Sequence, residues 1–377
     1  VVQATTGRSL TTHAAAMGED VASGGFTDDQ WLPVLDCGPL LAGETGALER
    51  FGRDLRAASE GVGFYFLENF GAVLTESVAS GMLDASSRAH GLPHATKSKW
   101  RLNESDSGFM PKGATTRWGS RGHPPLPEHE GNNEAYLFWG HGPPWVSPDR
   151  QLSTLEENNL LPDEQLPGFR EAVSSYAVAI ERLARALLPA YAIALHQEPN
   201  FFDGKFDKPC WALRLNCYPP TEAQEVGIPP HADGDFCTFL LQDDQPGLSV
   251  LRSTDGKWVQ APTRGRYSLL VNSGNTLMRL SNGRFPSTMH SASCLSFGSR
   301  ARARFSVPFF WSPSVDVVIE PLPVFVSEDN PSQYGATESG NVYSTGRVGL
   351  KEVADPERTD ERAATFTHPS KRSKMAE

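Results

Sequence analysis

The sequence predicts an α+β, mainly β fold: a β-sandwich or barrel whose helices come from the N-terminal half. Three observations support this prediction. Short apolar runs separated by turn residues crowd the region after Trp211, whereas the helical apolar spacing lies before residue 200. The 377 residues also include 34 Gly and 29 Pro, which indicates many turns and irregular connections.

The N-terminal region, residues 29–200, opens with alternating strand and helix patterns. Before it, residues 1–28 are small and polar without periodicity, so we expect a poorly ordered extension. The string "WLPVLDCGPLLAG" predicts a strand that ends at a Gly-Pro turn, and "GFYFLENFG" predicts a second strand. Between them "ALERFGRDLRAASEGV" has the apolar spacing of a helix.

Two longer features complete this region. Residues 99–148 are rich in Gly, Pro, Trp and charge, and a loop of this length is expected to be a functional lid or binding segment. The clearest helix runs from Phe169 to Leu195, and Pro189 is expected to kink or divide it.

The β core is predicted over residues 201–330. Its strand-like runs are "WALRLNCYPP", "CTFLLQDD", "GLSVLR", "WVQAP", "SLLVNSG", "TLMRLS", "STMHSAS" and "ARFSVPFFW". Residues 331–377 form a C-terminal extension whose end is charged and interrupted by Pro.

Charge and composition exclude several classes of partner. The net charge is -11 and the basic residues are scattered, so a nucleic-acid partner is not expected. No apolar run reaches the roughly 20 residues that span a bilayer, so no membrane partner is expected either. The five cysteines have no CxxC pair, which indicates reduced thiols in a cytoplasmic protein. A monomer or weak dimer is expected.

A candidate metal site combines His231 and Asp233 with His290, which lies 59 residues further on in another predicted strand. Two imidazoles and one carboxylate on one face are the ligand set of non-haem Fe(II) oxygenases. Zinc hydrolases also use such sets, but the helical HExxH signature and a Cys-rich site are absent, so iron is preferred over zinc. Asp235 would share the strand face, but three protein ligands suffice.

A second polar group is predicted on two other strands. Arg304 and Ser306 are two residues apart, and so are Asn216 and Tyr218, so each pair points to one face of its strand. A guanidinium matches carboxylate geometry, and the neighbouring hydroxyl adds a donor. These four side chains could enclose a dicarboxylic cosubstrate.

The order of these motifs resembles a known enzyme family. The strings NxYP at Asn216, HxD at His231, "NSGNTLMRLSNGRFPSTMH" and RxS followed by "VPFF" are similar to the isopenicillin-N-synthase-like branch of the Fe(II)- and 2-oxoglutarate-dependent dioxygenases. Upstream, "LPVLD", "GFYFLENFG" and "LPHATKSKW" resemble the opening segments of that branch. The resemblance covers about residues 31–330.

The resemblance implies a double-stranded β-helix, or jelly roll, with flanking N-terminal helices. It implies that His231, Asp233 and His290 hold Fe(II) and are the catalytic centre, and that Arg304 and Ser306 hold the far carboxylate of 2-oxoglutarate. Tyr218 and Asn216 would assist this cosubstrate. O2 would be the oxidant, with ascorbate as a further candidate cofactor.

Two departures from the family pattern qualify this assignment. The stretch from His290 to Arg304 is longer than usual, which leaves Arg302 as an alternative, but the register against "VPFF" favours Arg304. Cys217 stands where the family often has a second Tyr; we expect little effect because alternate strand residues face away from the site.

Substrate contacts are expected from side chains near the iron and from the long loop. Apolar and basic residues of both regions are the candidates: Phe236, Phe310, Phe109, Trp118, Trp139, Lys112, Arg117 and Arg121.

The expected activity is oxidation of a small molecule by hydroxylation, desaturation or cyclisation, with release of succinate and CO2, in specialised metabolism. One alternative is a 2-oxoglutarate-independent Fe(II) oxidase of the isopenicillin N synthase or aminocyclopropane-carboxylate oxidase type. Another is a catalytically silent binding or sensor protein on the same scaffold.

Overall fold

The computed structural model describes residues 31–102, 107–112, 131–140, 164–220, 226–294 and 301–345. The chain from Leu32 onward forms one compact unit, and the description below concerns that unit. The predicted N-terminal extension, residues 1–28, lies outside the described residues, and so does the predicted C-terminal extension after residue 345. Both predictions stay untested.

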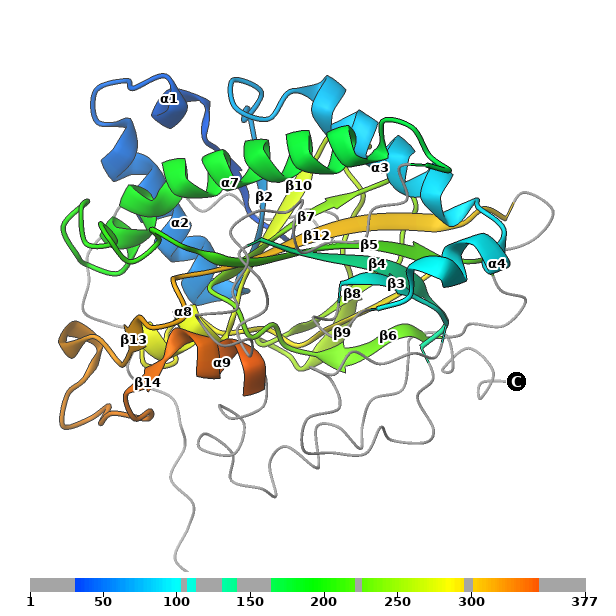
Figure 1. Ribbon diagram of the computed structural model, residues 1–377. Helices are drawn as coiled ribbons and strands as arrows, with labels where there is room; N and C mark the ends of the chain where they lie inside the picture. The colour runs from blue at the N-terminus through cyan, green and yellow to red at the C-terminus, as the bar shows by residue number, and fades with distance from the viewer. Residues whose placement is uncertain are drawn as a thin grey trace, which may run out of the picture. The chain divides into compact units, whose positions relative to one another are not determined.

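Two β-sheets form the centre of the unit (Figure 1). In order across the larger sheet, the strands are β1 (Val34–Asp36), β2 (Phe64–Glu68), β10 (Leu269–Ser273), β7 (Cys237–Gln242), β12 (Arg304–Ser312), β5 (Cys210–Tyr218), β4 (Glu134–Gly140) and β3 (Gly108–Met110). The smaller sheet contains β6 (Val226–His231), β11 (His290–Ser293), β8 (Leu248–Arg252) and β9 (Lys257–Gln260). All strand pairs in both sheets are antiparallel except β1 with β2.

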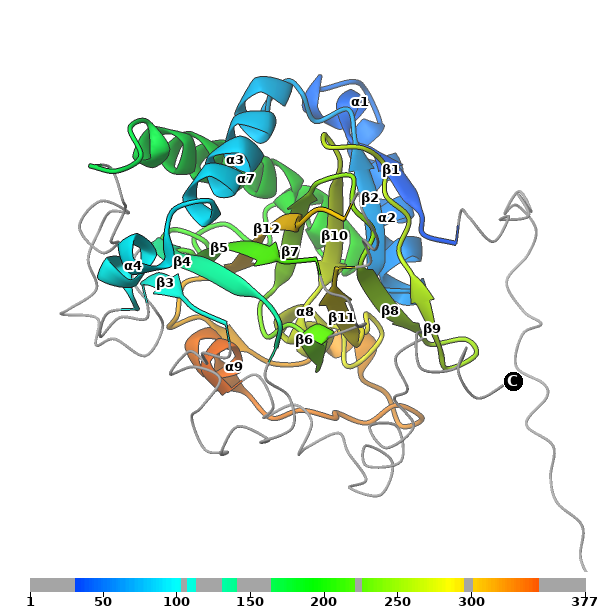
Figure 2. The same ribbon diagram turned by 90° about the vertical axis from the view of Figure 1, so that its right-hand side faces the viewer.

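Helices cover one face of the larger sheet, on the side away from β6, β8 and β9 (Figures 1 and 2). The principal ones are α2 (Ala47–Gly61), α3 (Glu76–His90) and α7 (Phe169–Ala194), and α7 packs against both others. Shorter helical segments are α1 (Gly38–Leu41), α4 (His94–Lys97), α8 (Asn275–Leu280) and α9 (Ser339–Thr345), with 3-10 turns at Ser98–Trp100 and Pro323–Phe325. A small pair of strands, β13 (Val318–Ile319) and β14 (Thr337–Glu338), follows the core.

Strand alternation divides the side chains of the larger sheet between two environments. Alternate residues of β5, namely Trp211, Leu213 and Leu215, join the large apolar core beneath the helices. The intervening residues Arg214, Asn216 and Tyr218 therefore lie on the opposite face, toward the smaller sheet. This inner face of a jelly roll is where the polar motifs of the sequence meet.

The predicted fold class is confirmed, and most predicted elements are present. The first helix and both early strands appear as α2, β1 and β2, and α7 continues through Pro189 without dividing. Residues on both sides of that proline, Leu187 and Tyr191, are buried, so packing holds the helix together despite the missing backbone donor.

Two elements differ from the prediction. The expected loop over residues 99–148 contains β3 and β4, which extend the larger sheet beyond β5. The run "TLMRLS", predicted as a strand, lies mostly in the short helix α8. No helix among the described residues has the length and apolarity required to cross a membrane.

Candidate metal and cosubstrate site

Three side chains converge at one end of the smaller sheet. His231 ends β6 and His290 begins β11, and the two residues are direct cross-strand partners. Asp233 follows β6, and its Oδ1 lies 3.6 Å from His231 Nε2 and 3.7 Å from His290 Nε2. One ligand atom from each residue lies within 4.8 Å of the other two. This is a geometry that a single metal ion can satisfy.

Hydrogen bonds orient both imidazoles toward this point. His231 Nδ1 lies 2.9 Å from the Pro229 carbonyl oxygen, and His290 Nδ1 lies 3.0 Å from that of Thr288. A carbonyl only accepts, so each Nδ1 carries the hydrogen and donates it. Each Nε2 is left with a lone pair for a metal, which is the usual way in which proteins fix a metal-binding histidine.

The carboxylate of Asp233 is oriented in the same manner. Its Oδ2 accepts hydrogen bonds from Thr238 Oγ1 at 2.6 Å and from Asn272 Nδ2 at 2.8 Å. Thr238 belongs to β7 and Asn272 to β10. The larger sheet therefore positions Asp233, the third metal ligand, beside the two histidines of the smaller sheet. Oδ1 remains directed at the histidines.

The protonation states favour metal binding at neutral pH. Burial and repulsion by His290 lower the pKa of His231 to about 4, so its Nε2 lone pair is available. Burial by itself would raise the pKa of Asp233, but attraction to His290 and His231 and the bonds from Thr238 and Asn272 outweigh that effect and lower it. The neutral imidazole of His231 and the ionised carboxylate of Asp233 are therefore the favoured forms, and both are the forms that bind a metal.

Asp235 lies beside the cluster without belonging to it. Its Oδ2 lies 2.8 Å from Thr238 Oγ1, whereas its buried Oδ1 has no hydrogen-bond partner. Burial, followed by the nearby charge of Asp233, raises the pKa of Asp235 well above its ordinary value. The residue is thus a neighbour of the metal site that favours the protonated form more than an ordinary aspartate does, in agreement with its omission from the predicted ligands.

Arg304 is buried at the start of β12, where its cross-strand partner is Tyr218. Its Nη2 donates to Gln242 Oε1 at 3.0 Å, but its Nε and Nη1 are buried without a hydrogen-bond partner. An unsatisfied buried guanidinium is costly unless an anion completes its hydrogen bonds. Arg302, the alternative, lies at the surface in a 2.7 Å ion pair with Asp244.

The other three predicted cosubstrate residues surround this guanidinium. Ser306 is the cross-strand partner of Asn216, whose Nδ2 donates to Ser306 Oγ at 3.4 Å. The Arg304 guanidinium carbon lies 5.0 Å from the ring centre of Tyr218. Gly227 on β6 permits this arrangement, because a Cβ there would lie 2.3 Å from the Tyr218 ring. The structure therefore brings all four side chains together.

The predicted substrate residues divide into three groups. Trp139 and Phe310 lie on the inner face of the larger sheet, in the row that contains Thr238. Lys112 is exposed after β3. Trp118, Arg117 and Arg121 lie outside the described residues, so their predicted roles remain untested.

Phe109 and Phe236 are corrections to the prediction. Both rings belong to the core beneath the helices, on the outer face of the larger sheet. Phe236 packs edge-on against Phe202, Phe206 and Tyr191, and Phe109 packs against Tyr136. Neither ring can line a pocket on the inner face.

Several inner-face residues were not singled out from the sequence. Thr238 and Asn272 orient Asp233, Gln242 contacts Arg304, and Phe64 packs edge-on against His290 with ring centres 5.5 Å apart. Arg214 lies two residues before Asn216 on the same face of β5. Extending the period-two pattern of "LRLNCY" by one step would have found it.

A second group of potential metal ligands lies on the outer face. His90, Glu134 and Cys217 offer atoms within 4.8 Å of one another. However, His90 Nδ1 contacts Glu134 at 3.1 Å and His90 Nε2 contacts the Leu215 carbonyl at 3.0 Å, so both ring nitrogens are occupied. Lys97 also pairs with Glu134. This group is therefore a buried ion network rather than a metal site.

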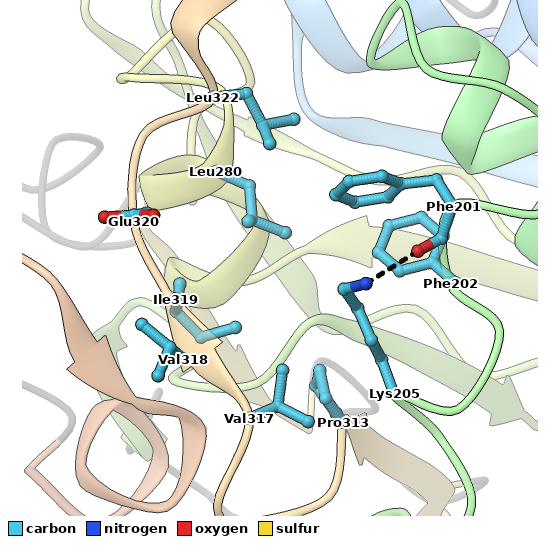
Figure 3. A pocket seen from close by; sticks show the side chains of 10 residues that line it. All are labelled: Phe201, Phe202, Lys205, Leu280, Pro313, Val317, Val318, Ile319, Glu320 and Leu322. Atoms are coloured by element: carbon cyan, nitrogen blue, oxygen red, sulfur yellow. Dashed lines mark hydrogen bonds between the residues drawn. The ribbon is translucent and has the colours of Figure 1, made fainter.

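A pocket also lies away from both groups, between α8, the turn that contains Phe201 and Lys205, and the segment around β13 (Figure 3). It has a volume of about 220 Å³ and is mostly apolar, and Lys205 Nζ, bonded to the Phe201 carbonyl, lies at its edge. None of the predicted site residues lines it.

Comparison with known proteins places this fold and site in a family. Residues 209–313 match the model of the 2OG-Fe(II) oxygenase superfamily. Gibberellin 20 oxidase 2 of rice is 30% identical over 306 residues, which cover 80% of this chain and 72% of that protein. The 2-oxoglutarate-Fe(II) type oxidoreductase ppzC of Metarhizium rileyi is 35% identical over 202 residues, which cover 50% of this chain and 52% of that protein. The chain thus matches about half the length of the Metarhizium relative.

Solved structures show the same fold. A full-length Neurospora crassa protein in complex with alpha-KG and thymine has a TM-score of 0.71 at 21% identity, and the match covers 85% of this chain and 97% of that one. The fold is therefore shared, and the rice relative together with the family model defines the class: the chain belongs to the 2OG-Fe(II) oxygenase superfamily. The resemblance inferred from the sequence is confirmed, as are Fe(II), 2-oxoglutarate and O2 as the cofactors; ascorbate stays a prediction.

Proposed function

We propose that this chain is a non-haem Fe(II)- and 2-oxoglutarate-dependent dioxygenase that oxidises a small molecule in specialised metabolism. Hydroxylation, desaturation and cyclisation are the outcomes consistent with this class, each with release of succinate and CO2. The observation that carries the proposal is the convergence of His231 Nε2, Asp233 Oδ1 and His290 Nε2 on the inner face that also contains the unsatisfied guanidinium of Arg304.

The ligand set fits Fe(II). Two imidazole nitrogens and one carboxylate oxygen leave open positions for the cosubstrate and O2, and no described cysteine joins the group. Iron with bound 2-oxoglutarate would supply the oxidising chemistry. The protein's part is to direct Nε2 of His231 and His290 at the metal through their Nδ1–H bonds and to hold Asp233 through Thr238 and Asn272.

Arg304 and Ser306 would bind the far carboxylate of 2-oxoglutarate. Arg304 presents Nε and Nη1 without partners, and Ser306 and Tyr218 border the same space. A fork of two N–H donors matches a carboxylate in two parallel hydrogen bonds. Asn216 would hold the Ser306 hydroxyl in place, at 3.4 Å.

The test is an anaerobic titration of the purified protein with Fe(II) and 2-oxoglutarate. We expect a weak visible charge-transfer band, and succinate once O2 and a substrate are added. Asp233→Ala should abolish the band while the circular dichroism spectrum stays unchanged, because the residue lies outside the strands, between β6 and β7. A wild-type protein that gives neither the band nor succinate would contradict the proposal.

The alternatives predict different results in the same experiment. A 2-oxoglutarate-independent oxidase would turn over with Fe(II), O2 and a reductant alone, so dependence of turnover on 2-oxoglutarate excludes it. A catalytically silent sensor would keep its binding function in Asp233→Ala and show no turnover in the wild type. The intact metal ligands and the unsatisfied Arg304 favour the dioxygenase.

The partner proposed is a small molecule, and we also propose a cytoplasmic monomer or weak dimer without nucleic-acid or membrane partners. All five cysteines are free and buried, which suits a reducing compartment. Light scattering coupled to size-exclusion chromatography tests the oligomeric state, with a tight higher oligomer as the contrary result.

A further inference from the structure

Arg214 is a cationic side chain on the inner face for which neither the metal nor the cosubstrate provides a role. It lies on β5 between two cross-strand pairs of the same face. The pair toward Tyr218 is Asn216 with Ser306, and the pair on the other side is Ala212 with Phe310. The Asn133 amide connects Arg214 to the Gly227 carbonyl of β6, the strand that ends at His231. The guanidinium thus faces the smaller sheet, which carries both metal-binding histidines.

The hydrogen bonds of Arg214 are incomplete. When the Asn133 amide is oriented with its oxygen toward Arg214, Oδ1 accepts from Nη2 at 3.2 Å and Nδ2 donates to the Gly227 carbonyl at 2.9 Å. Arg214 Nε is buried and has no partner. Among the described residues, no carboxylate lies within the 4.0 Å of an ion pair with Arg214. Within that part of the chain, a neutral amide takes the place of a counter-charge.

Once the charges of Fe(II), 2-oxoglutarate, Asp233 and Arg304 are paired with one another, the positive charge of Arg214 has no negative partner among the described residues. The two carboxylates of 2-oxoglutarate are matched by Arg304 and by the metal, and Asp233 is matched by the metal as well. Asp235, the other acidic side chain nearby, is bonded to Thr238 at 2.8 Å rather than to Arg214. A buried cation without a counter-charge is costly, so an anion should complete the site.

Apolar residues surround the guanidinium on the inner face. Leu137 on β4 is the cross-strand partner of Arg214. The adjacent row contains Trp139 and Phe310, which pack in one apolar cluster and which the sequence had indicated as pocket walls. Phe310 is partly exposed, so its ring can meet a ligand. An apolar wall beside one cation suits an organic anion better than an inorganic one.

We propose that Arg214 binds a carboxylate of the substrate, so that the substrate class is an organic acid with an apolar body. The inference rests on the proposed function, because it takes the metal and Arg304 as already occupied by the cosubstrate. Two parallel N–H donors of Arg214 would bind the carboxylate, and the apolar body would lie against Phe310. The oxidised position would then be a carbon of that body held at a fixed distance from the acid.

The experiment compares matched acids and amides on the assembled site. The protein is loaded with Mn(II), a redox-silent stand-in for Fe(II), and with N-oxalylglycine, an analogue of 2-oxoglutarate. Phenylacetate, cyclohexanecarboxylate and octanoate are each paired with the primary amide, and binding is measured by ligand-observed NMR. The wild type, Arg214→Gln and Arg214→Lys are compared, with Arg302→Gln as a surface control.

We expect at least one acid to bind the wild type about tenfold or more tightly than its amide, because a charge-assisted bond to Arg214 is lost in the amide. Arg214→Gln should remove this preference, Arg214→Lys should retain part of it, and Arg302→Gln should retain all of it. The affinity for N-oxalylglycine should change by less than about threefold in Arg214→Gln, since its carboxylates have other partners.

Three results would overturn the inference. The first is equal binding of acids and amides by the wild type, or binding of neither. The second is an acid preference that survives in Arg214→Gln. The third is a loss of N-oxalylglycine affinity in Arg214→Gln similar to that in Arg304→Gln, which would assign Arg214 to the cosubstrate. Failure of the proposed function is seen separately, as a missing Fe(II)–2-oxoglutarate band in the wild type.

Discussion

At the scale of single residues, the candidate metal site depends on side chains that do not touch the metal. Thr238 illustrates this, because its one hydroxyl lies 2.6 Å from Asp233 Oδ2 and 2.8 Å from Asp235 Oδ2. A hydroxyl has a single hydrogen, so it donates to one carboxyl group and accepts from the other. The raised pKa of Asp235 favours its carboxyl group as that donor, and Thr238 can then donate to Asp233.

Thr238→Val should therefore weaken metal binding. The substitution keeps the shape of the side chain but removes the hydrogen bond that orients Asp233, and such losses reduce metal affinity about 10- to 100-fold. Thr238→Ser keeps the hydroxyl and should bind nearly as well as the wild type. Titration with Mn(II) followed by electron paramagnetic resonance measures both affinities. Equal affinity in Thr238→Val and the wild type would refute this role.

Arg304 supports a second prediction at this scale. Arg304→Gln removes two buried donors that await a carboxylate, and we expect the affinity for 2-oxoglutarate to fall about 100-fold. The Fe(II) affinity should not change, since the guanidinium does not contact the ligands. The intensity of the visible band at increasing 2-oxoglutarate concentration measures the affinity for 2-oxoglutarate. A change in this affinity of less than about threefold would contradict the prediction.

Which site residues the sequence can identify depends on whether a strand is continuous. Tyr218, Asn216, Arg304 and Ser306 lie in unbroken strands, so the two-residue period places them correctly. Phe236 does not, because β6 ends at His231 and β7 begins only at Cys237, with a bend between them. In a bend the alternation is lost, and the ring turns to the helical core.

At the scale of elements, a buried ion network joins α3, α4, β4 and β5. Lys97 donates to the His90 carbonyl at 2.9 Å and also pairs with Glu134, which contacts His90 at 3.1 Å. Burial opposes the ionisation of Glu134, but the hydrogen bonds and charges of His90 and Lys97 outweigh it and lower its pKa. The network thereby fixes the helical layer to the edge of the sheet.

Glu134→Gln should cost about 3 kcal/mol in the free energy of unfolding near pH 7, because it leaves a buried ammonium group without its counter-charge. The folded pKa of Glu134 lies below the ordinary 4.5, so its contribution is present above pH 4.5 and is lost as the pH falls through the folded value. The gap between wild type and variant should therefore shrink below pH 4.5.

Urea unfolding at several pH values measures this gap. Asp84→Asn is the matched control, because it removes an exposed ion pair with Arg266 at 2.7 Å and should cost less than about 1 kcal/mol. A gap between wild type and Glu134→Gln that is absent at pH 7, or that widens in acid, would disprove the role assigned to the network.

Some elements were not predicted correctly from the sequence, and the reasons are physical. Strand β4 reads "EAYLFWG" and is buried on both faces, so it lacks the polar alternation that marks a half-exposed strand. The run "TLMRLS" is too short to separate a buried strand from one turn of helix by its pattern alone. In contrast, α7 spans 26 residues with a sustained helical period, and its pattern is unambiguous.

At the scale of the whole molecule, all five cysteines are buried and unpaired. Burial, followed by charges close by, raises the pKa of Cys37 to about 12, and the same causes raise that of Cys217 to about 12. The thiolate is the reactive form, so these thiols should be almost inert in the native protein. Their reactivity then reports opening of the fold.

Ellman's reagent at pH 8 should accordingly label fewer than one thiol per chain rapidly in the native state, and all five after denaturation. Bound metal and cosubstrate should slow the native reaction further, since they stabilise the folded form. Rapid, stoichiometric labelling of the native protein would show that a buried cysteine is accessible.

The pairing of β2 with β10 joins segments that lie far apart in the sequence, and this constrains the order in which the parts of the protein can fold. Residues 64–68 must wait for residues 269–273, and these same residues include Asn272, which supports Asp233. His290 and Arg304 lie later still in the chain. A ribosome must therefore finish most of the polypeptide before any iron site exists, and contacts so distant in sequence favour slow folding. We therefore expect iron to bind late, after translation, and a truncated chain that ends before β12 lacks Arg304 and Ser306.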